Sequence, residues 1–295
     1  MVQTRSASCF KVRLGTWREC PRSADVTRQT HWAGWEGRLV PVDRGRYQRA
    51  EIVSRKDHAE DLWVIRVRPE HKLVFKPGQY VALGIEQPEH LIERAYSICS
   101  SPLEDEVEFF VELVVDGGLT PLMHKLAIGD WLWMRRQTKG LFTLDGKSGH
   151  IQHLLICTVT GVAPYVSMIR TLAREAEAGK DPGARLVVLH AASRSWEFAY
   201  RAELEALAER WGWVRYIPTI SRPWEDPEWK GEVGRVEDVL RKYVDTLGFD
   251  PSNTTAYVCG HPEMIENSKA ILKRRGFAKE SIREELYWVL PKKQA

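Results

Sequence analysis

The sequence predicts two domains, an antiparallel β-barrel followed by an α/β domain with a parallel sheet. From Tyr47 onward, short segments rich in β-branched and aromatic residues follow one another with turn signals between them. After Ser148, such segments alternate with segments whose apolar residues recur at helical spacing. The length of 295 residues suits two domains of ordinary size.

The barrel is expected to contain six strands and one short helix. We predict strands at residues 47–55, 61–69, 79–85, 92–98, 106–115 and 130–136, and a helix at 119–127. Turn signals such as KPGQ and DGG separate them. So many short strands in a row favour a closed barrel.

The second domain is expected to alternate strands and helices on a parallel sheet. We predict strands at residues 153–159, 184–192, 214–221, 255–260 and 282–288, and helices at 163–179, 196–211, 235–244 and 262–276. Such sheets bind ligands beyond the carboxyl ends of their strands. The predicted domains are 1–46, an N-terminal extension; 47–148, the barrel; and 149–295, the α/β domain.

Composition disfavours several classes of protein. It is 43% hydrophobic and 28% charged, and the net charge of +3 gives no reason to expect nucleic-acid binding. No apolar run approaches the ~18–20 residues that span a bilayer. The five cysteines form no C-x-x-C pair, so we expect no metal site, no disulfide framework and a reducing, cytoplasmic location.

The first 46 residues are rich in Arg and Ser and poor in acids, which loosely resembles an organelle transit peptide. A disordered or loosely docked tail, or an over-extended start, is the interpretation we favour.

Two segments pose chemical questions. In IERAYSI, Arg94 and Tyr96 share one face of a strand, and a buried charge is costly unless an anion meets it. Arg94 is therefore either an exposed strand residue or the partner of an anion outside the chain. In TVTGVAPYVSMI, Thr160 and Gly161 precede a helix that Pro164 opens, and a helix N-terminus can bind an anion. This turn alone is also compatible with an ordinary strand–helix connection.

Taken in order, the motifs resemble the ferredoxin–NADP(H) reductase family, in particular its bacterial flavoprotein members. They are RAYS at 94–97, DGGLTP at 116–121, TGVAP at 160–164, SR at 221–222, GR at 234–235, CGHPEM at 259–264 and YW at 287–288. The resemblance covers about residues 47–288.

This resemblance implies FAD in the barrel. Arg94 would pair with the FAD pyrophosphate, Tyr96 would pack on the isoalloxazine, and Ser97 would hydrogen-bond near the hydride-accepting nitrogen, with Ala95 between the first two. Backbone and hydroxyl donors to the pyrophosphate would come from Gly117, Gly118, Leu119 and Thr120. The plain alternative for these four residues is an ordinary turn.

The resemblance also implies NADP(H) at the turn that contains Thr160, Gly161 and Pro164. Val159 stands where the family usually has Gly; we expect its β-branched side chain to avoid positive φ and to hold the nucleotide farther from the backbone. Cations near the adenosine ribose would meet a 2′-phosphate, whereas an acid would meet a free 2′-hydroxyl. The candidate cations, which favour NADPH, are Arg194, Arg222 and Arg235.

Two further residues are implied near the nicotinamide. Cys259 would position it without acting as a nucleophile, and a small buried core residue is the alternative. Trp288 would stack on the flavin with Tyr287 pointing away, or it would close the edge of the core.

The predicted function is that of a monomeric FAD enzyme that takes a hydride from NADPH and passes single electrons to ferredoxin or flavodoxin. Hydride transfer needs proximity and alignment and no acid or base. The alternatives are a reductase component serving an oxygenase or free flavin, and a non-catalytic FAD-binding regulator of the same fold.

Overall fold

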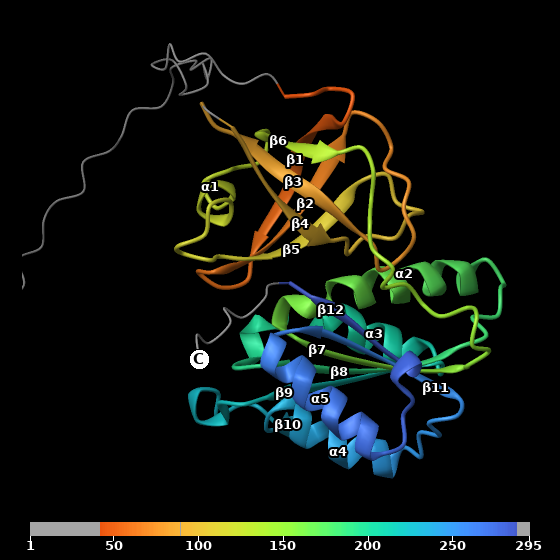
Figure 1. Ribbon diagram of the computed structural model, residues 1–295. Coiled ribbons are helices and arrows are strands. Elements are labelled where there is room, and N and C mark those ends of the chain that lie inside the picture. Colours follow the sequence, from red (N-terminus) through yellow and green to blue (C-terminus); the bar gives the residue numbers. More distant parts are fainter. Residues whose placement is uncertain (1–41, 89, 288–295) are drawn as a thin grey trace, which may run out of the picture. The chain divides into compact units, whose positions relative to one another are not determined.

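A computed structural model describes residues 42–88 and 90–287 (Figure 1). Most of the predicted N-terminal extension, and Trp288, lie outside these residues, so those predictions stay predictions. In the part of the chain that is described, no helix is both long and apolar enough to cross a membrane.

The first sheet has six antiparallel strands in the order β4-β3-β6-β1-β2-β5. Its strands are β1 (Tyr47–Asp57), β2 (Leu62–Pro69), β3 (Tyr80–Glu86), β4 (Leu91–Ser97), β5 (Val107–Glu112) and β6 (Trp131–Arg135). The four-residue helix α1 (Thr120–Met123) lies between β5 and β6 in the chain. The two outer strands approach each other, because the N–H of Cys99, just past β4, donates to Glu108 O on β5 at 2.8 Å. The prediction of a six-stranded barrel with one short helix is confirmed.

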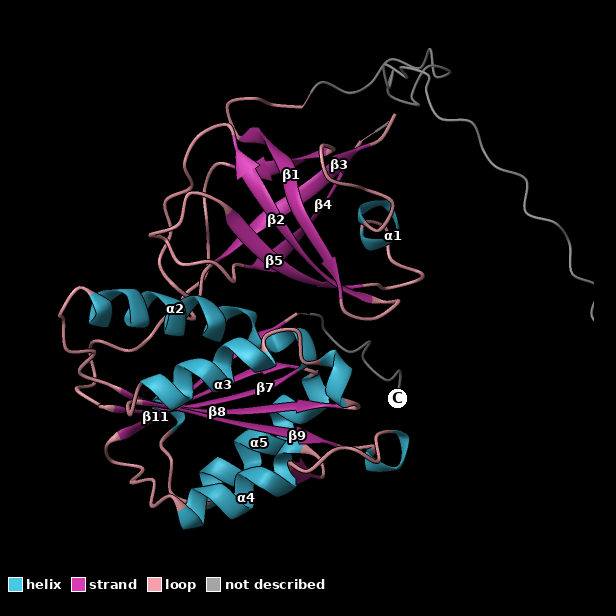
Figure 2. Ribbon diagram, turned by 180° about the vertical axis from the view of Figure 1, so that it is seen from behind, coloured by secondary structure: helices cyan, strands magenta, loops and turns pink. Residues whose placement is uncertain are grey.

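The second sheet has six parallel strands in the order β10-β9-β8-β7-β11-β12. Its strands are β7 (Gln152–Thr158), β8 (Arg185–Ala192), β9 (Val214–Ile220), β10 (Glu232–Val233), β11 (Thr254–Gly260) and β12 (Ile282–Leu286). The helices are α2 (Ala163–Glu177), α3 (Arg201–Arg210), α4 (Val236–Thr246) and α5 (Pro262–Arg274). Figure 2 shows α2 and α3 on one face of this sheet and α4 and α5 on the other. The parallel α/β domain is confirmed, whereas the two-residue strand β10 was not predicted.

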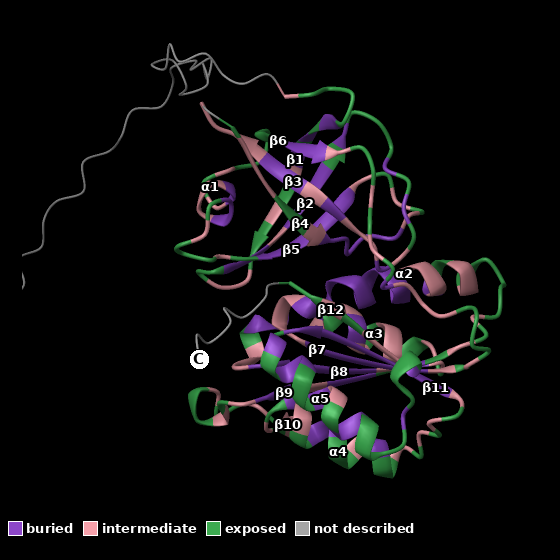
Figure 3. Ribbon diagram, viewed as in Figure 1, coloured by how far each residue is buried: buried purple, intermediate pink, exposed green. Residues whose placement is uncertain are grey.

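The central strands of the parallel sheet are buried on both faces. Figure 3 shows β7, β8 and β11 largely in the buried colour. Along β7, Leu155 and Cys157 pack into one apolar cluster and Leu154 and Ile156 into another, because side chains alternate across a strand. Helices cover both faces, so a continuous apolar run such as HLLIC marks a buried strand.

The helix predicted at 196–211 begins later, at Arg201. The residues Ser195–Glu197 form a single 3₁₀ turn, η2, and Phe198 leaves the helical conformation at φ −87° and ψ 77°. The Phe198 ring packs edge-on against His190, with 4.8 Å between ring centroids. The predicted start of the helix was wrong because this tertiary contact outweighs the local helical pattern.

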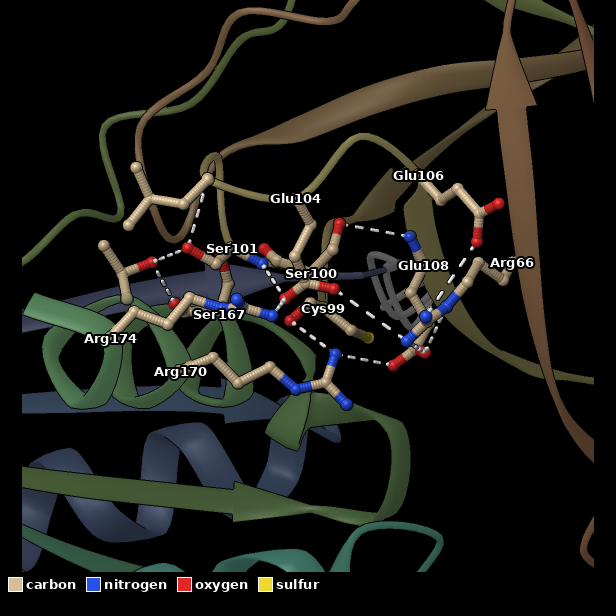
Figure 4. Close-up of polar contacts among 12 residues, drawn as sticks. Arg66, Cys99, Ser100, Ser101, Glu104, Glu106, Glu108, Ser167, Arg170 and Arg174 are labelled. Atoms are coloured by element: carbon tan, nitrogen blue, oxygen red, sulfur yellow. Dashed lines mark hydrogen bonds and ion pairs between the residues drawn. The ribbon is translucent and has the colours of Figure 1, made fainter. Parts of the chain in front are cut away.

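One face of α2 binds the segment that follows β4 (Figure 4). Ser167 Oγ donates to Ser100 O at 2.7 Å. Thr171 Oγ1 donates to Ser167 O at 2.7 Å and accepts from Ser101 Oγ, which lies 2.9 Å away. Both side chains lie on one side of the helix, since residues four apart share a face. The helix that begins at the TGVAP turn is therefore tied to the segment directly after Ser97.

A buried carboxylate, Glu108 on β5, joins the same two regions (Figure 4). Glu108 is 5% exposed and accepts hydrogen bonds from Arg66 Nη2 at 2.8 Å, Arg170 Nη1 at 2.8 Å and Tyr200 Oη at 2.9 Å. Arg170 also makes two hydrogen bonds to Glu203, at 2.6 and 2.7 Å. Burial raises the pKa of Glu108, but the Arg170 charge and the Arg66 hydrogen bond outweigh it and leave that pKa below its usual value. Glu108 is thus an ionised acid at neutral pH.

Candidate functional site

Arg94 lies on β4 as an exposed cation. Its Nη1 donates to the neighbouring Glu93 carbonyl oxygen at 2.7 Å, and among the described residues it has no acidic partner. The Glu93 carboxylate instead binds Arg135, at 2.5 Å, and Tyr47 Oη, at 2.9 Å. The guanidinium of Arg94 is therefore available to an anion from outside the chain.

Tyr96 lies two residues farther along β4 and is partly buried against the barrel core. Its ring meets Phe109 edge-on with 6.4 Å between centroids, and within the described residues its hydroxyl has no hydrogen-bond partner. Burial raises the pKa of Tyr96, so the phenol stays neutral and can donate. Ala95, between Arg94 and Tyr96, is exposed.

The turn at the start of α1 differs in two respects from the prediction, because two of the four predicted donors are already used. Thr120 Oγ1 donates to Val114 O at 3.1 Å and accepts from Val114 N at 2.9 Å, so the hydroxyl closes the turn and is not a free donor. The Gly117 N–H is also used, by Val114 O at 2.8 Å. The N–H groups of Gly118 and Leu119 have no backbone partner in the described part of the chain. A phosphate at this turn would therefore find its donors in these two backbone N–H groups, and not in Thr120.

These residues fit the flavin dinucleotide that the family resemblance implies. Within the described residues, the site offers a guanidinium without an acidic partner, two N–H groups without a backbone partner and a half-buried phenol. A pyrophosphate and an attached aromatic ring require such groups.

The turn after β7 is packed tightly against the end of β11. It forms the 3₁₀ turn η1 (Val159–Val162) and leads into α2, with Pro164 in the first helical turn as predicted. A Cβ added at Gly161 would lie 2.4 Å from Cys259 O. Gly260, at φ +131°, would place a Cβ 2.3 Å from Thr158 Oγ1. Both positions therefore require glycine.

Val159 adopts φ +40°, contrary to the expectation that its β-branched side chain would avoid positive φ. His190 lies beneath it, with Nε2 2.9 Å from Val159 O and Nδ1 3.0 Å from Tyr216 Oη. Burial lowers the pKa of His190 to about 4, so the ring is neutral: Nε2–H donates to Val159 and Nδ1 accepts from Tyr216. This buried pair holds the backbone in a conformation that is costly for valine.

Four side chains meet where β4, β11 and β12 end. Ser97 Oγ donates to Glu285 Oε1 at 2.7 Å, and Glu285 is the register partner of Cys259 in the β11–β12 pair. Tyr287 Oη donates to Thr160 O at 3.2 Å. The sequence predicted Ser97 and Cys259 but missed Glu285, whose signal was an acid two residues before Tyr287 in the final strand.

The electrostatics of this cluster raise the pKa values of two of its groups, Cys259 and Glu285. Burial, and then the Glu285 carboxylate, raise the pKa of the fully buried Cys259 thiol well above its usual value. Burial also raises the pKa of Glu285, opposed by the hydrogen bond from Ser97. A protonated thiol is a poor nucleophile, which agrees with the positioning role expected for Cys259.

The three arginines predicted near the ribose do not gather in one place. Arg194 and Arg222, each two residues past a strand end, both contact Glu225; Arg222 Nη1 lies 3.5 Å from its Oε1. Arg235 precedes α4, and its side chain lines a cavity of about 250 Å³ between α4 and α5, beside Arg274. Among the described residues Arg235 makes no ion pair with Glu225, so its place near the ribose stays a prediction.

Comparisons with known proteins agree with this geometry. Residues 49–142 match an oxidoreductase FAD-binding domain, and residues 155–270 match an oxidoreductase NAD-binding domain. A ferredoxin–NADP reductase of Azotobacter vinelandii is 30% identical over 244 residues, covering 75% of this chain and 87% of the relative. The reductase component of a phenol 2-monooxygenase from Pseudomonas is 29% identical over 243 residues, covering 81% of this chain and 65% of the relative.

The fold is shared with a solved ferredoxin NADP⁺ reductase of Neisseria gonorrhoeae that holds FAD and NADP. The TM-score is 0.71 at 24% identity, and the match covers 82% of this chain and 99% of that one. A cytochrome P450 reductase of Amycolatopsis aligns with a TM-score of 0.69 at 26% identity, over 82% of this chain and 70% of that one.

Proposed function

Because the chain belongs to the ferredoxin–NADP(H) reductase family, we propose that it takes a hydride from NADPH with FAD and passes single electrons to a ferredoxin or a flavodoxin. The observation that supports this most strongly is the 2.7 Å hydrogen bond from Ser97 to Glu285. It joins the strand that carries the flavin-binding residues to the strand that ends beside the nucleotide turn. Flavin and nicotinamide would meet at this point.

The residues of β4 and of the turn before α1 bind and orient the cofactor. When bound, FAD supplies the hydride acceptor and releases electrons one at a time. Arg94 and the N–H groups of Gly118 and Leu119 hold the pyrophosphate, and the Tyr96 ring packs against the flavin. Trp288, next to Tyr287, is the proposed aromatic that the nicotinamide must displace.

The cluster at the strand ends aligns the nicotinamide. The Ser97 hydroxyl has its proton directed at Glu285 Oε1, which fixes the orientation of the oxygen. The buried Cys259 side chain lies at the base of this cluster, and it carries no charge that would attract water. Alignment of this kind lowers the barrier to hydride transfer without an acid or base.

A reductase component of an oxygenase is the second candidate, favoured by the similarity to the phenol 2-monooxygenase component. This chain spans 65% of that relative, so the relative carries further sequence. For our first candidate we propose a monomer in the cytoplasm, with domains at 47–148 and 149–295. The described cysteines are free and buried, which suits a reducing compartment.

The test begins with the flavin. We expect heat to release FAD, identified by chromatography, and Arg94→Ala to reduce the FAD content by about tenfold or more, because a charge-assisted phosphate contact is lost. Arg68→Ala is the matched control, since Arg68 is also an exposed strand arginine but pairs with Glu106 at 2.7 Å. Release of FMN alone, or equal FAD content in the two variants, contradicts the assignment.

The electron acceptor is tested next. We expect NADPH to reduce the flavin and the reduced enzyme to reduce a ferredoxin or a flavodoxin one electron at a time. Efficient reduction of free flavin or of an oxygenase, with no transfer to either small protein, favours the second candidate.

A further inference from the structure

We propose that Glu225 limits the selectivity of this protein for NADPH, because its carboxylate holds the two arginines that would bind the 2′-phosphate. The phosphate must displace Glu225 before it can use them. This inference rests on the proposed function, since it concerns the ribose end of the same nucleotide.

The two arginines lie at one corner of the parallel sheet. Beyond the ends of β8 and β9 the chain continues side by side, with Ser221 N donating to Ala192 O and Arg222 N donating to Ser193 O, both at 3.0 Å. Arg194 and Arg222 therefore leave adjacent segments at the carboxyl edge, where a parallel sheet binds its ligand. Glu225 lies between them, in contact with Arg194 Nε and with Arg222 Nη1.

The charges at this corner cancel. Arg194 and Arg222 contribute two positive charges, while Glu225 and Glu197, the latter 3.3 Å from Arg194, contribute two negative ones. A phosphate that approached this set would gain the guanidinium contacts only against the repulsion of a carboxylate a few ångströms away. Moving Glu225 aside leaves a net positive corner, which a doubly charged phosphate prefers.

Glu225 is the acid that can move. Glu197 is 9% exposed, and its Oε2 accepts the Ser193 N–H at 2.8 Å, so it is part of the local backbone structure. Glu225 ends a three-residue turn, η3 (Pro223–Glu225), and its side chain is 33% exposed. Among the described residues its carboxylate contacts only the two arginines.

The same carboxylate is suited to a coenzyme without the phosphate. An acid at the ribose can accept a hydrogen bond from a free 2′-hydroxyl, whereas a phosphate there needs cations. With Glu225 in place the corner can also accept the free ribose of NADH, whereas with Glu225 displaced it favours the phosphate of NADPH. We infer that this one residue sets the balance between the two.

The experiment uses the full-length, FAD-loaded protein and two probes, adenosine 2′,5′-bisphosphate and 5′-AMP, titrated by calorimetry. We expect Glu225→Gln to bind the bisphosphate about tenfold more tightly, since one charge-assisted contact is worth about that factor, and to bind 5′-AMP unchanged. Glu228→Gln is the matched control: it removes the same charge three residues away, from an exposed side chain with no ion pair among the described residues. The gain should vanish when Arg222→Ala is added to Glu225→Gln.

Other outcomes overturn the inference. Equal affinities in Glu225→Gln and Glu228→Gln would show that Glu225 does not compete with the phosphate. Weaker binding of the bisphosphate in Glu225→Gln would show that Glu225 orients the arginines for it. If the wild type binds neither probe and NADPH fails to reduce its flavin, the proposed function fails as well, whereas the first two results leave that function intact.

Discussion

The buried acid Glu108 offers the sharpest test of how the barrel and α2 are held together. Glu108→Gln keeps the shape of the side chain and removes its charge at a position that is 5% exposed. The carbonyl oxygen of the glutamine amide can accept a hydrogen bond from one of the donors around Glu108. Its NH₂ group is itself a donor, and it must then face another of these donors. Arg170, whose side chain is 13% exposed, then loses one of its two anionic partners.

The magnitude follows from the two guanidinium contacts. Arg66 is 36% exposed and keeps two other carboxylates nearby, Glu104 at 3.8 Å and Glu106 at 3.9 Å. Removing the charge of Glu108 therefore costs little stability at Arg66. The loss therefore falls on Arg170, for which breaking a buried ion pair costs about 3 kcal/mol. In a protein of this size that corresponds to a fall in Tm of roughly 5 °C.

Thermal and urea unfolding of the FAD-loaded protein measure this loss, with Glu106→Gln as the control. Glu106 pairs with Arg68 at the surface, where an ion pair contributes about 0–1 kcal/mol. Because the pKa of Glu108 is lowered in the folded protein, its contribution is present above the unfolded pKa and is lost as pH falls through the lower, folded value. The difference between wild type and Glu108→Gln should accordingly shrink below about pH 4. Equal stability of the two variants at pH 7 would refute the reasoning.

Three further predictions concern the nucleotide site. Val159→Gly should tighten NADP⁺ binding several-fold, measured by titration of the flavin spectrum. Glycine adopts positive φ without strain, and the substitution removes a side chain from the turn. Unchanged binding would contradict this prediction. Ser97→Ala should slow flavin reduction by NADPH roughly tenfold or more in stopped-flow measurements, because Glu285 loses its hydrogen-bond donor, while the FAD content is retained. An unchanged rate would show that this hydrogen bond has only a structural role. Arg222→Ala should lower the kcat/KM ratio of NADPH to NADH by about tenfold, whereas Arg235→Ala should leave this ratio unchanged, since Arg222 contacts Glu225 and Arg235 does not. Equal ratios in the two variants would refute this placement.

The sequence by itself determined the two sheets of this protein, because the period of apolar residues along a segment is a local property. It also marked Arg94 as either an exposed strand residue or the partner of an outside anion, and the turn before Pro164 as a strand–helix connection. Neither inference required knowledge of a distant partner.

Only the tertiary structure decided which side chains act together. Ser97 and Glu285 are 188 positions apart, and Arg194 and Glu225 are 31 apart, so no local pattern connects them. The same reason explains the shortened helix and the positive φ of Val159: in each case His190, on a neighbouring strand, holds a segment against its own preference. Spacing encodes secondary structure, whereas the charge and hydrogen-bond partners of a site depend on which strand ends the folded sheet brings to one edge.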